Sequence, residues 1–399
     1  MRTGSITTGG GVALGVWGVA LLSGAAGAQV EFHLDGRIRF EQVDQAGISD
    51  EAQGVTARHR FGVSSRLSDR WSVLAEGEHV FALVDDFNDT INGQTRYPVI
   101  ADPDAFELNR LQLGFSHDAV SATLGRQRLV IADSRYVGNV GYRQNEQTFD
   151  AVRVSAQFHD RVTLDYAYLD RVNRIFGPDS AMGDWELDSH LLVASAEVLG
   201  GEARVTGLLF DNEDVPGLSS ETWAVYWGAS RPLGEGEVRY FVEYAQQGDY
   251  ADNPAAFDLD ALRGEVRFTS GRFGVWAGAE QLEGNGSRGF ATPLATLHKF
   301  QGFADAFLTT PATGLQDVYL GGSVGLGDGW GLSAPRVQLI WHAFDAEQGG
   351  ADLGSELDLV FTGRLTQTVG LMVKYADYDS GDAGPASREK LAIMLNYSF

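Results

Sequence analysis

The chain has 399 residues, no cysteine and a formal net charge of −24 at pH 7. This acidity argues against nucleic acid as the main partner, because the phosphate backbone is bound by clusters of Lys and Arg. The lack of cysteine is consistent with passage through an oxidising compartment, where stray thiols pair wrongly. The length would fit two or three soluble domains, but a single large β-barrel has the same size.

The first 28 residues have the pattern of a secretory signal peptide. Arg2 gives a positive start, an apolar run covers 12–22, and Ala26-Gly27-Ala28 offers small residues for cleavage before Gln29. A transmembrane anchor is the alternative, but the run is too short for one. We therefore expect residues 1–28 to be removed and residues 29–399 to form the mature protein.

Beyond this segment, no stretch approaches the roughly 20 apolar residues that a membrane-spanning helix needs. Apolar and polar residues instead alternate along most of the chain, as in Phe32, Leu34 and Ile38 against Arg37 and Arg39, which is typical of half-buried strands. Such segments number about eighteen, and outer-membrane barrels carry even strand numbers. The predicted strands cover 31–42, 54–66, 70–84, 105–116, 120–131, 146–158, 160–171, 185–199, 202–212, 219–231, 236–248, 258–270, 272–283, 314–325, 334–345, 355–366, 368–378 and 388–399.

The connections between these strands alternate in length. Tight connections occur at 66–70, 116–120, 158–161, 199–202, 270–272 and 366–368. Longer polar connections lie between them, at 43–53, 85–104, 132–145, 172–184, 249–257, 284–313 and 379–387. Short periplasmic turns and long extracellular loops are sorted in this way in outer-membrane barrels. The fold class predicted is therefore all-β, a single antiparallel transmembrane β-barrel.

The chain closes on an apolar strand with Leu391, Ile393, Leu395, Tyr397 and Phe399 on one face. A terminal strand ending in Phe is the pattern that the outer-membrane assembly machinery reads, although the last strand of a soluble sheet is an alternative. We expect a monomer in the outer membrane. Its expected partners are that machinery, membrane lipid and lipopolysaccharide.

Two parts of the sequence are similar to the alginate-export type of outer-membrane barrel. One comprises 125–128 (GRQR) and 135–152 (RYVGNVGYRQNEQTFDAV). The other comprises 297–308 (LHKFQGFADAFL), with Thr310-Pro311 and 314–317 (GLQD) after it. The resemblance implies a barrel of similar strand count, whose arginine-lined pore passes an anionic polysaccharide such as alginate. A general porin or a small-organic-anion porin is the alternative function.

Inward-facing positions of the predicted strands are rich in arginine. A cationic ring in a narrow, partly dehydrated pore attracts carboxylates and repels cations, and guanidinium can hold a carboxylate with two hydrogen bonds. The alternative is that lumen charges pair across strands and brace the wall, because acids such as Glu243, Glu265, Glu280, Glu356 and Asp358 share the lumen. The predicted pore-lining residues are Arg37, Arg39, Arg58, Arg60, Arg110, Arg126, Arg128, Arg135, Arg143, Arg153, Arg239, Arg263, Arg267 and Arg336.

Two segments depart from the regular alternation. Around 125–129 the arginines fall in phase with the apolar face, which predicts a bulge or a rim position. The connection 284–313 carries six apolar residues between 297 and 308 at roughly helical spacing. We expect a short helix there that folds over or into the barrel mouth and brings His298 and Lys299 to the constriction. A helix packed against neighbouring loops is the alternative.

Two short motifs resemble enzyme signatures without their structural setting. The segment 321–325 matches G-x-S-x-G but lies inside a predicted strand, and 284–289 matches G-x-G-x-x-G but opens a polar loop. The histidines show no metal-type spacing. We therefore expect a channel rather than an enzyme, without catalytic residues, cofactor or metal, and a surface hydrolase or adhesin is the least favoured alternative.

Overall fold

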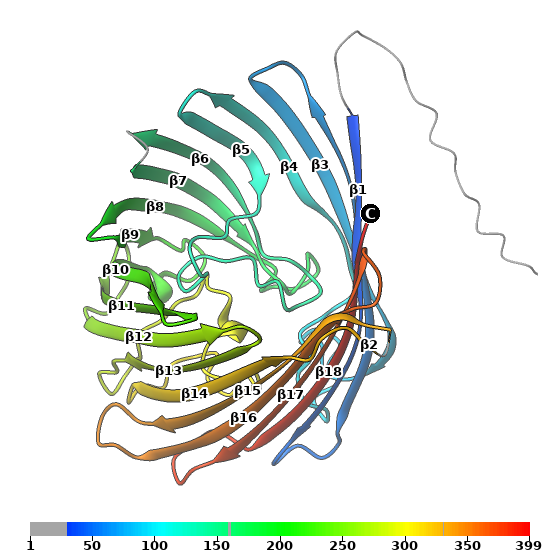
Figure 1. The fold of residues 1–399 in the computed structure, drawn as a ribbon, viewed down its shortest axis with the longest axis vertical. Helices are drawn as coiled ribbons and strands as arrows, with labels where there is room; N and C mark the ends of the chain where they lie inside the picture. The colour runs from blue at the N-terminus through cyan, green and yellow to red at the C-terminus, as the bar shows by residue number, and fades with distance from the viewer. Residues whose placement is uncertain (1–29, 159–160, 330) are drawn as a thin grey trace, which may run out of the picture.

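The protein is an 18-stranded antiparallel β-barrel (Figure 1). The structure, a computed structural model, describes residues 30–158, 161–329 and 331–399, so the predicted signal peptide lies outside the described residues. The strands are β1 (Val30–Gln45), β2 (Ala52–Arg66), β3 (Trp71–Asp86), β4 (Ala105–His117), β5 (Val120–Gln127), β6 (Thr148–Phe158), β7 (Val162–Asn173), β8 (Asp184–Val198), β9 (Gly201–Phe210), β10 (Ser220–Leu233), β11 (Gly236–Asp249), β12 (Asp258–Ser270), β13 (Phe273–Leu282), β14 (Leu315–Gly325), β15 (Ser333–Asp345), β16 (Asp352–Arg364), β17 (Val369–Ser380) and β18 (Arg388–Ser398).

Each strand pairs with the next along the chain, and the first and last strands close the barrel. The closing register of β1 and β18 runs from Asp35 opposite Ser398 to Gln45 opposite Arg388. Closure leaves no strand edge unpaired, which a sheet in lipid requires. The predicted fold class is confirmed.

The outer face of the barrel is apolar because the side chains alternate between lumen and exterior along each strand. On β1, Phe32, Leu34 and Ile38 are exposed, and on β12, Leu262 and Val266 are exposed. A closed barrel that exposes such an apolar face is built for a hydrocarbon surrounding. The fold is that of an outer-membrane barrel, as predicted.

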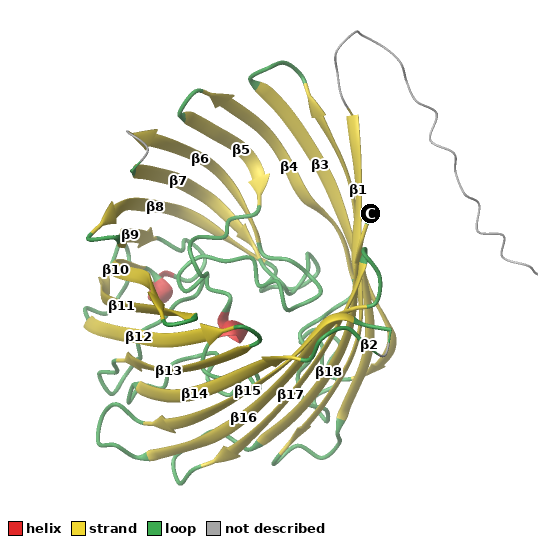
Figure 2. Ribbon diagram, in the orientation of Figure 1, coloured by secondary structure: helices red, strands yellow, loops and turns green. Residues whose placement is uncertain are grey.

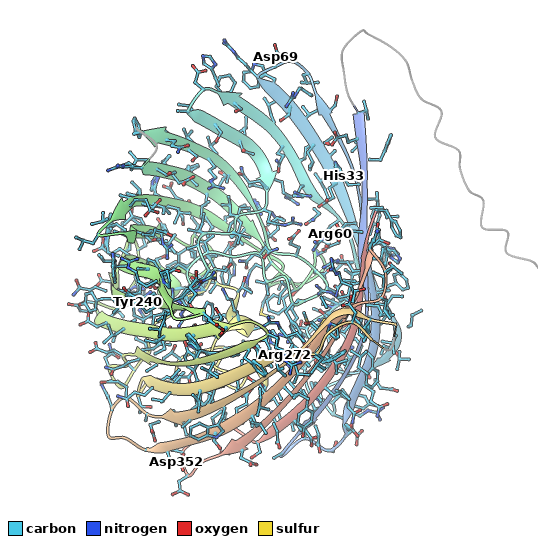
Figure 3. The ribbon with its side chains drawn as sticks, viewed as in Figure 1. His33, Arg60, Asp69, Tyr240, Arg272 and Asp352 are labelled. Carbon is cyan, nitrogen blue, oxygen red and sulfur yellow. The ribbon has the colours of Figure 1, made fainter. Side chains whose placement is uncertain are left out.

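Short turns and long loops lie at opposite ends of the barrel. Asp69, in the turn between β2 and β3, and Asp352, which begins β16 after a loop, lie at opposite edges of the view in Figure 3. The β8–β9, β10–β11 and β12–β13 turns each comprise two residues, 199–200, 234–235 and 271–272. The predicted sorting is confirmed, and by it the long loops are extracellular.

Two of the long loops enter the barrel, and we call 128–147 the first inner loop and 283–314 the second inner loop (Figure 2, green). They contact one another through a parallel bridge between Val137 and Leu294. The amide of Gly138 donates to the carbonyl of Leu294 at 2.9 Å, and that of Thr296 donates to Ser134 at 3.1 Å. The two inner loops therefore form one hydrogen-bonded unit.

The first inner loop begins where the sequence predicted a bulge or rim position. Gly125 has φ +110°, and β5 ends at Gln127 rather than at residue 131. A Cβ at Gly125 would overlap the carbonyl of Leu111 on β4. Glycine is thus required at this position, and it lies two residues before the chain leaves the wall.

The helix predicted over 297–308 is wrong. Only a single 3-10 turn, η2 (Leu297–Lys299), forms there, and a second 3-10 turn, η1 (Pro216–Leu218), lies in another loop. Gln301, Gly302 and Asp305 have φ of +52°, +81° and +60°, which a right-handed helix does not allow. None of the helices in the described residues is long and apolar enough to cross a membrane.

Candidate translocation path

Arginines on the inner faces of β1 and β2 form a basic wall that holds the first inner loop. Arg37 donates to the carbonyls of Gly141, Tyr142 and Arg143 at 3.0, 2.7 and 3.2 Å. Arg39 is fully buried and donates to the carbonyl of Tyr142 at 2.6 Å. These contacts satisfy backbone carbonyls that would otherwise lie unpaired inside the barrel.

The buried arginines of this wall are also paired with carboxylates. Arg39 forms ion pairs with Glu41 at 3.1 Å and with Asp102. Arg60 pairs with Glu78 and lies 3.4 Å from Glu146. Such pairs are held by partners on all sides, so the buried guanidinium groups are not free to bind a solute. The bracing alternative describes them better than the pore-lining prediction does.

Glu146 lies at the centre of this cluster on the first inner loop. It is bonded to Arg128, and its Oε2 accepts from the amide of Asn109 at 2.9 Å. Burial alone would raise the pKa of Glu146, but Arg60 and Arg128 outweigh burial and lower it to about 2. Glu146 is therefore ionised at every physiological pH and fixes the end of the first inner loop against β2 and β4.

Carboxylates of β16, which only β17 and β18 separate from β1 in the closed barrel, hold the second inner loop. The amide of Ala304 donates to Glu356 Oε1 at 2.7 Å, and the amide of Phe303 donates to Asp358 at 3.4 Å. Gly302 packs so closely on Glu356 that a Cβ there would overlap the carboxylate. We call Glu356 and Asp358 on β16 the acidic anchor.

Asp305 joins both inner loops to the wall. Its carboxylate bonds to Arg143 of the first inner loop at 3.0 Å, to Lys390 of β18 at 2.6 Å and to His298 Nδ1 at 2.7 Å. Burial alone would raise the pKa of Asp305, but the hydrogen bond from His298 and the charges of Lys390 and Arg143 hold it well below its ordinary value. Asp305 is therefore a permanent anion at the junction of the loops.

His298 is buried in the same cluster as a neutral ring. Lys374 Nζ lies 3.0 Å from Nε2 and donates to it, so Nδ1 carries the proton that bonds to Asp305. Burial, followed by the charges of Lys374 and Lys390, lowers the pKa of His298 to about 3. The ring of Tyr142 stacks on it at 3.5 Å. His298 is thus enclosed at the loop junction instead of facing an anion at the constriction.

Three cavities lie in the remaining space on the side of β8–β15. The outer cavity, about 720 Å³, lies among the extracellular loops and reaches Arg135 and Gln301. The central cavity, about 410 Å³, lies inside the barrel and is also lined by Gln301. The inner cavity, about 500 Å³, shares Glu265 and Arg267 with the central one and reaches the β8–β9 turn. The shared residues arrange the cavities in series from the loops to the turns.

A small cluster separates the outer and central cavities. Arg135 of the first inner loop bonds to Glu280 of β13 at 2.6 Å and to Thr292 at 3.1 Å. The Gln301 amide also donates to Glu280, and the Arg135 guanidinium lies 4.7 Å from the ring of Phe300. Both inner loops and β13 contribute to this cluster, and because it lies between the two cavities we take it as the constriction of the candidate path.

Several predicted pore residues line these cavities. Arg135 lines the outer cavity, and Arg263, Arg267 and Lys299 line the central one. Arg239 lines the inner cavity, with Arg267. In the central cavity the carboxylates are bonded to basic side chains, whereas Lys299 donates to the backbone carbonyl of Asp133 at 2.7 Å. The carboxylate pairs are Asp133–Arg263, Glu265–Arg267, Glu280–Arg135 and Asp317–His342.

Other predicted residues face the lumen outside this series. Arg58 of the basic wall bonds to Asp35 at 3.1 Å, and Arg110 of β4 bonds to Glu76 of β3 at 2.8 Å. Arg153 bonds to Asp165 at 2.8 Å. Arg336 donates to the hydroxyl of Ser323 at 2.9 Å and is exposed. Contact of any of these groups with a solute stays a prediction.

The structure corrects the placement of Arg126. The ladder stays in register through it, with Leu111 on one side and Asp150 on the other. Leu111 and Leu124 are exposed on the outer face, so Arg126 faces outward too. It bonds to Asp150 at 2.8 and 2.9 Å on the outside of the barrel.

Sequence reasoning missed four basic or acidic groups at the path. Lys390 alternates with Leu391 and Ile393, so the period of two would have placed it inside the barrel. Asp305, Arg174 and Arg288 lie on irregular loops, where no period indicates which way a side chain points.

The comparisons support the fold at low sequence identity. OccK9 (OpdG) of Pseudomonas aeruginosa is 14% identical, with a TM-score of 0.74 over 93% of this chain and 98% of that one. Pseudomonas aeruginosa OpdK, in its structure with vanillate, is 12% identical with a TM-score of 0.73, and Acinetobacter baumannii OccAB4 is 12% identical with a TM-score of 0.72. Both matches also cover 93% of this chain and 98% of the other. These neighbours are outer-membrane porins, channels rather than enzymes. No family model matches the chain, and no curated protein matches it.

The resemblance to the alginate-export type of barrel is wrong. Solved structures that the chain matches over nearly its whole length include Occ and Opd porins. The segments that carried the resemblance, 135–152 and 297–308, lie largely in the two inner loops. An alginate pathway has no support.

Proposed function

We propose that this protein is an outer-membrane porin for small organic anions. The observation that carries the proposal is the division of the lumen by the inner loops into cavities of about 410, 500 and 720 Å³. Sites of about 300–1,000 Å³ suit small molecules. A polymer chain would have to displace loops that are joined to one another through Asp305 and to the wall through Glu146.

Charge along the cavities favours an anion. Each carboxylate of the central cavity is bonded to a basic side chain, whereas Lys299 is held by a backbone carbonyl. At the inner cavity Arg239 and Arg267 lie beside Glu197, Glu202 and Glu265, whereas Arg174 and Arg288 lie at the outer cavity, whose described lining has no acidic residue. Cationic groups in a narrow path raise the local concentration of anions. The presence of vanillate with OpdK supports an organic carboxylate as the type of solute.

Planar-bilayer recording tests this proposal. In a KCl gradient the reversal potential should show anion preference, and Lys299→Gln should weaken that preference while the barrel still folds. Liposome swelling should show uptake of vanillate and exclusion of an anionic oligosaccharide. A cation-selective wild-type channel would overturn the proposal, and a reversal potential near zero would identify a general porin.

A further inference from the structure

The outer cavity has a lining unlike the rest of the molecule. The chain carries 54 Asp and Glu residues, yet none of the described residues that line this cavity is acidic. Its charged residues are Arg135, Arg174 and Arg288. The largest cavity of the three is therefore cationic in a protein with a net charge of −24.

The loops around the cavity separate their charges by direction. In the β7–β8 loop Arg174 lines the cavity, whereas Asp179 is exposed to solvent. In the β9–β10 loop Gly217 and Leu218 line it, whereas Glu213 and Asp214 are exposed. The acidic groups thus face outward and leave the interior of the cavity basic.

Arg174 and Arg288 are positioned without carboxylate partners. The Arg174 guanidinium lies 3.7 Å from the ring of Trp185 and donates to the carbonyl of Met182 at 3.2 Å. Arg288 lies 4.2 Å from the ring of Phe257 and donates to the carbonyl of Gly217 at 2.7 Å. Neither forms an ion pair within the described ranges, unlike the buried arginines of β1 and β2. Stacking and carbonyl contacts fix both groups while leaving their charge uncompensated.

Burial also acts on the uncompensated charge of Arg174. It lowers the pKa of the guanidinium to about 10, and no charged neighbour opposes the shift. The group is still a cation at neutral pH, but its charge is poorly solvated. A desolvated cation beside an open cavity gains more from an incoming anion than a solvated one does.

The rest of the lining is largely apolar. Leu218, Phe257, Phe307 and Leu308 contribute side chains, and Leu308 is exposed into the space. Gln247 lies among them, but its amide already donates to Thr222 and to the carbonyl of Ala291. Such a surface favours a ligand with an apolar body and a single anionic group over a sugar or an inorganic ion.

We propose that the outer cavity is a capture site for amphiphilic organic anions, with the carboxylate at Arg174 and Arg288 and the apolar body against Phe257 and Leu308. The ligand would wait there, on the extracellular side of the Arg135–Glu280–Gln301 constriction. The inference rests on the proposed function for the step that follows capture, but binding itself is independent of it.

Calorimetry on the purified full-length protein in detergent tests the site with benzoate as the probe. Acetate shares the carboxylate without the ring, and benzylamine shares the ring with the opposite charge. We expect benzoate to bind more tightly than either. The double variant R174Q/R288Q should weaken benzoate binding at least about tenfold, because charge-assisted hydrogen bonds carry that much each. R336Q, an exposed arginine elsewhere in the lumen, is the matched control and should leave binding unchanged.

A second variant keeps the test independent of charge and of loop folding. Leu308→Trp should fill the cavity and weaken benzoate binding while both arginines remain, with heat-modifiable migration on gels reporting an intact barrel. The site would be overturned if a folded R174Q/R288Q protein bound benzoate like the wild type, or if R336Q weakened binding equally. Cation selectivity with benzoate binding retained would refute the proposed function alone.

Discussion

The two inner loops are held inside the barrel by opposite chemistry. On the first inner loop, arginines of β1 donate to backbone carbonyls, as Arg37 does to Gly141. On the second inner loop, carboxylates of β16 accept from backbone amides, as Glu356 does from Ala304. One stretch of the wall therefore holds its loop through basic side chains and another, beyond β17 and β18, holds its loop through carboxylates.

This difference shows why lumen charge is a poor guide to transport. Most buried charges inside the barrel are consumed in positioning the loops, with partners on every side. The groups available to a solute are those held by rings or carbonyls alone, such as Arg174, Arg288 and Lys299. Substitutions in the basic wall, in the acidic anchor and at the loop junction should therefore separate groups that position the loops from groups that act on a solute.

Removal of a buried cation from the basic wall should have the largest effect. Arg39→Ala leaves Asp102 and Glu41 without their main partner in a fully buried site, and such losses cost about 3–5 kcal/mol of unfolding free energy. Arg37→Ala removes only carbonyl and Asn396 contacts and should cost about 1–3 kcal/mol. Denaturant unfolding in detergent measures both. Equal losses would show that the carboxylate pairs do not set the stability of this wall.

The second-largest loss of stability should come from Gly302→Ala, which disturbs the acidic anchor. The substitution adds strain at φ +81° and displaces Glu356, for a total of about 2–4 kcal/mol. Freed from its anchor, the second inner loop should let single-channel conductance rise. Gly286→Ala is the matched control in the same loop, with φ +85° but no neighbour within 4 Å, and should cost only about 1–2 kcal/mol. A rise in conductance in both variants would assign the effect to backbone strain alone.

The stability of the junction between the two inner loops should decrease in acid because of His298. Its folded pKa of about 3 lies below the ordinary value of 6.5, so below pH 6.5 the unfolded chain binds more protons than the folded one. Stability from the neutral ring is therefore complete above about pH 6.5 and lost as the pH falls toward 3. From pH 7 to 5 the loss should be about 2 kcal/mol.

Thermal unfolding of His298→Gln across pH isolates this contribution. The variant should show a smaller decline between pH 7 and 5 than the wild type. His117→Gln, at an exposed ring near the β4–β5 turn, should decline as the wild type does. An unchanged slope in His298→Gln would mean that the junction is protonated already at neutral pH.

Removal of a charge that belongs to neither the basic wall nor the acidic anchor should have the smallest effect on stability. Arg336→Gln removes an exposed cation bonded only to a hydroxyl, and stability should change by no more than about 0.5 kcal/mol. Anion preference in bilayers should fall slightly, because one mouth charge is lost. A destabilisation comparable to that of Arg37→Ala would place Arg336 in the bracing network.

The period of two predicted the strands closely because lipid on one face and charge on the other force every second residue outward. The predicted strand 258–270 coincides with β12, and 388–399 differs from β18 by one residue. The same rule already placed Arg126 in phase with Leu124, and treating that phase as a pore position was the error. The local pattern was correct where it was followed.

The inner loops lay beyond such reasoning because distant strands decide their structure. Phe307 packs on Phe344 at 4.7 Å and on Tyr378 at 5.6 Å, and these partners come from β15 and β17. The apolar residues between 297 and 308 have different surroundings: Phe300 lies against Arg135 of the first inner loop, and Leu308 lines the outer cavity. The outer cavity was equally hidden, because its arginines belong to different loops.

The strands that close the barrel are also those that the inner loops bridge. Arg143 lies 3.7 Å from Glu41 of β1, and through Asp305 it is linked to Lys390 of β18. β1 and β18 come from opposite ends of the chain. Such distant pairing is slow because the entropy of closing a long loop is lost before the strand contacts form. Inner loops that are already packed against one another would offer Asp305 as a partner to Lys390 before β1 and β18 pair. Sealing of the barrel and setting of its aperture then become one event, so a chain with misplaced loops would remain an unsealed assembly intermediate.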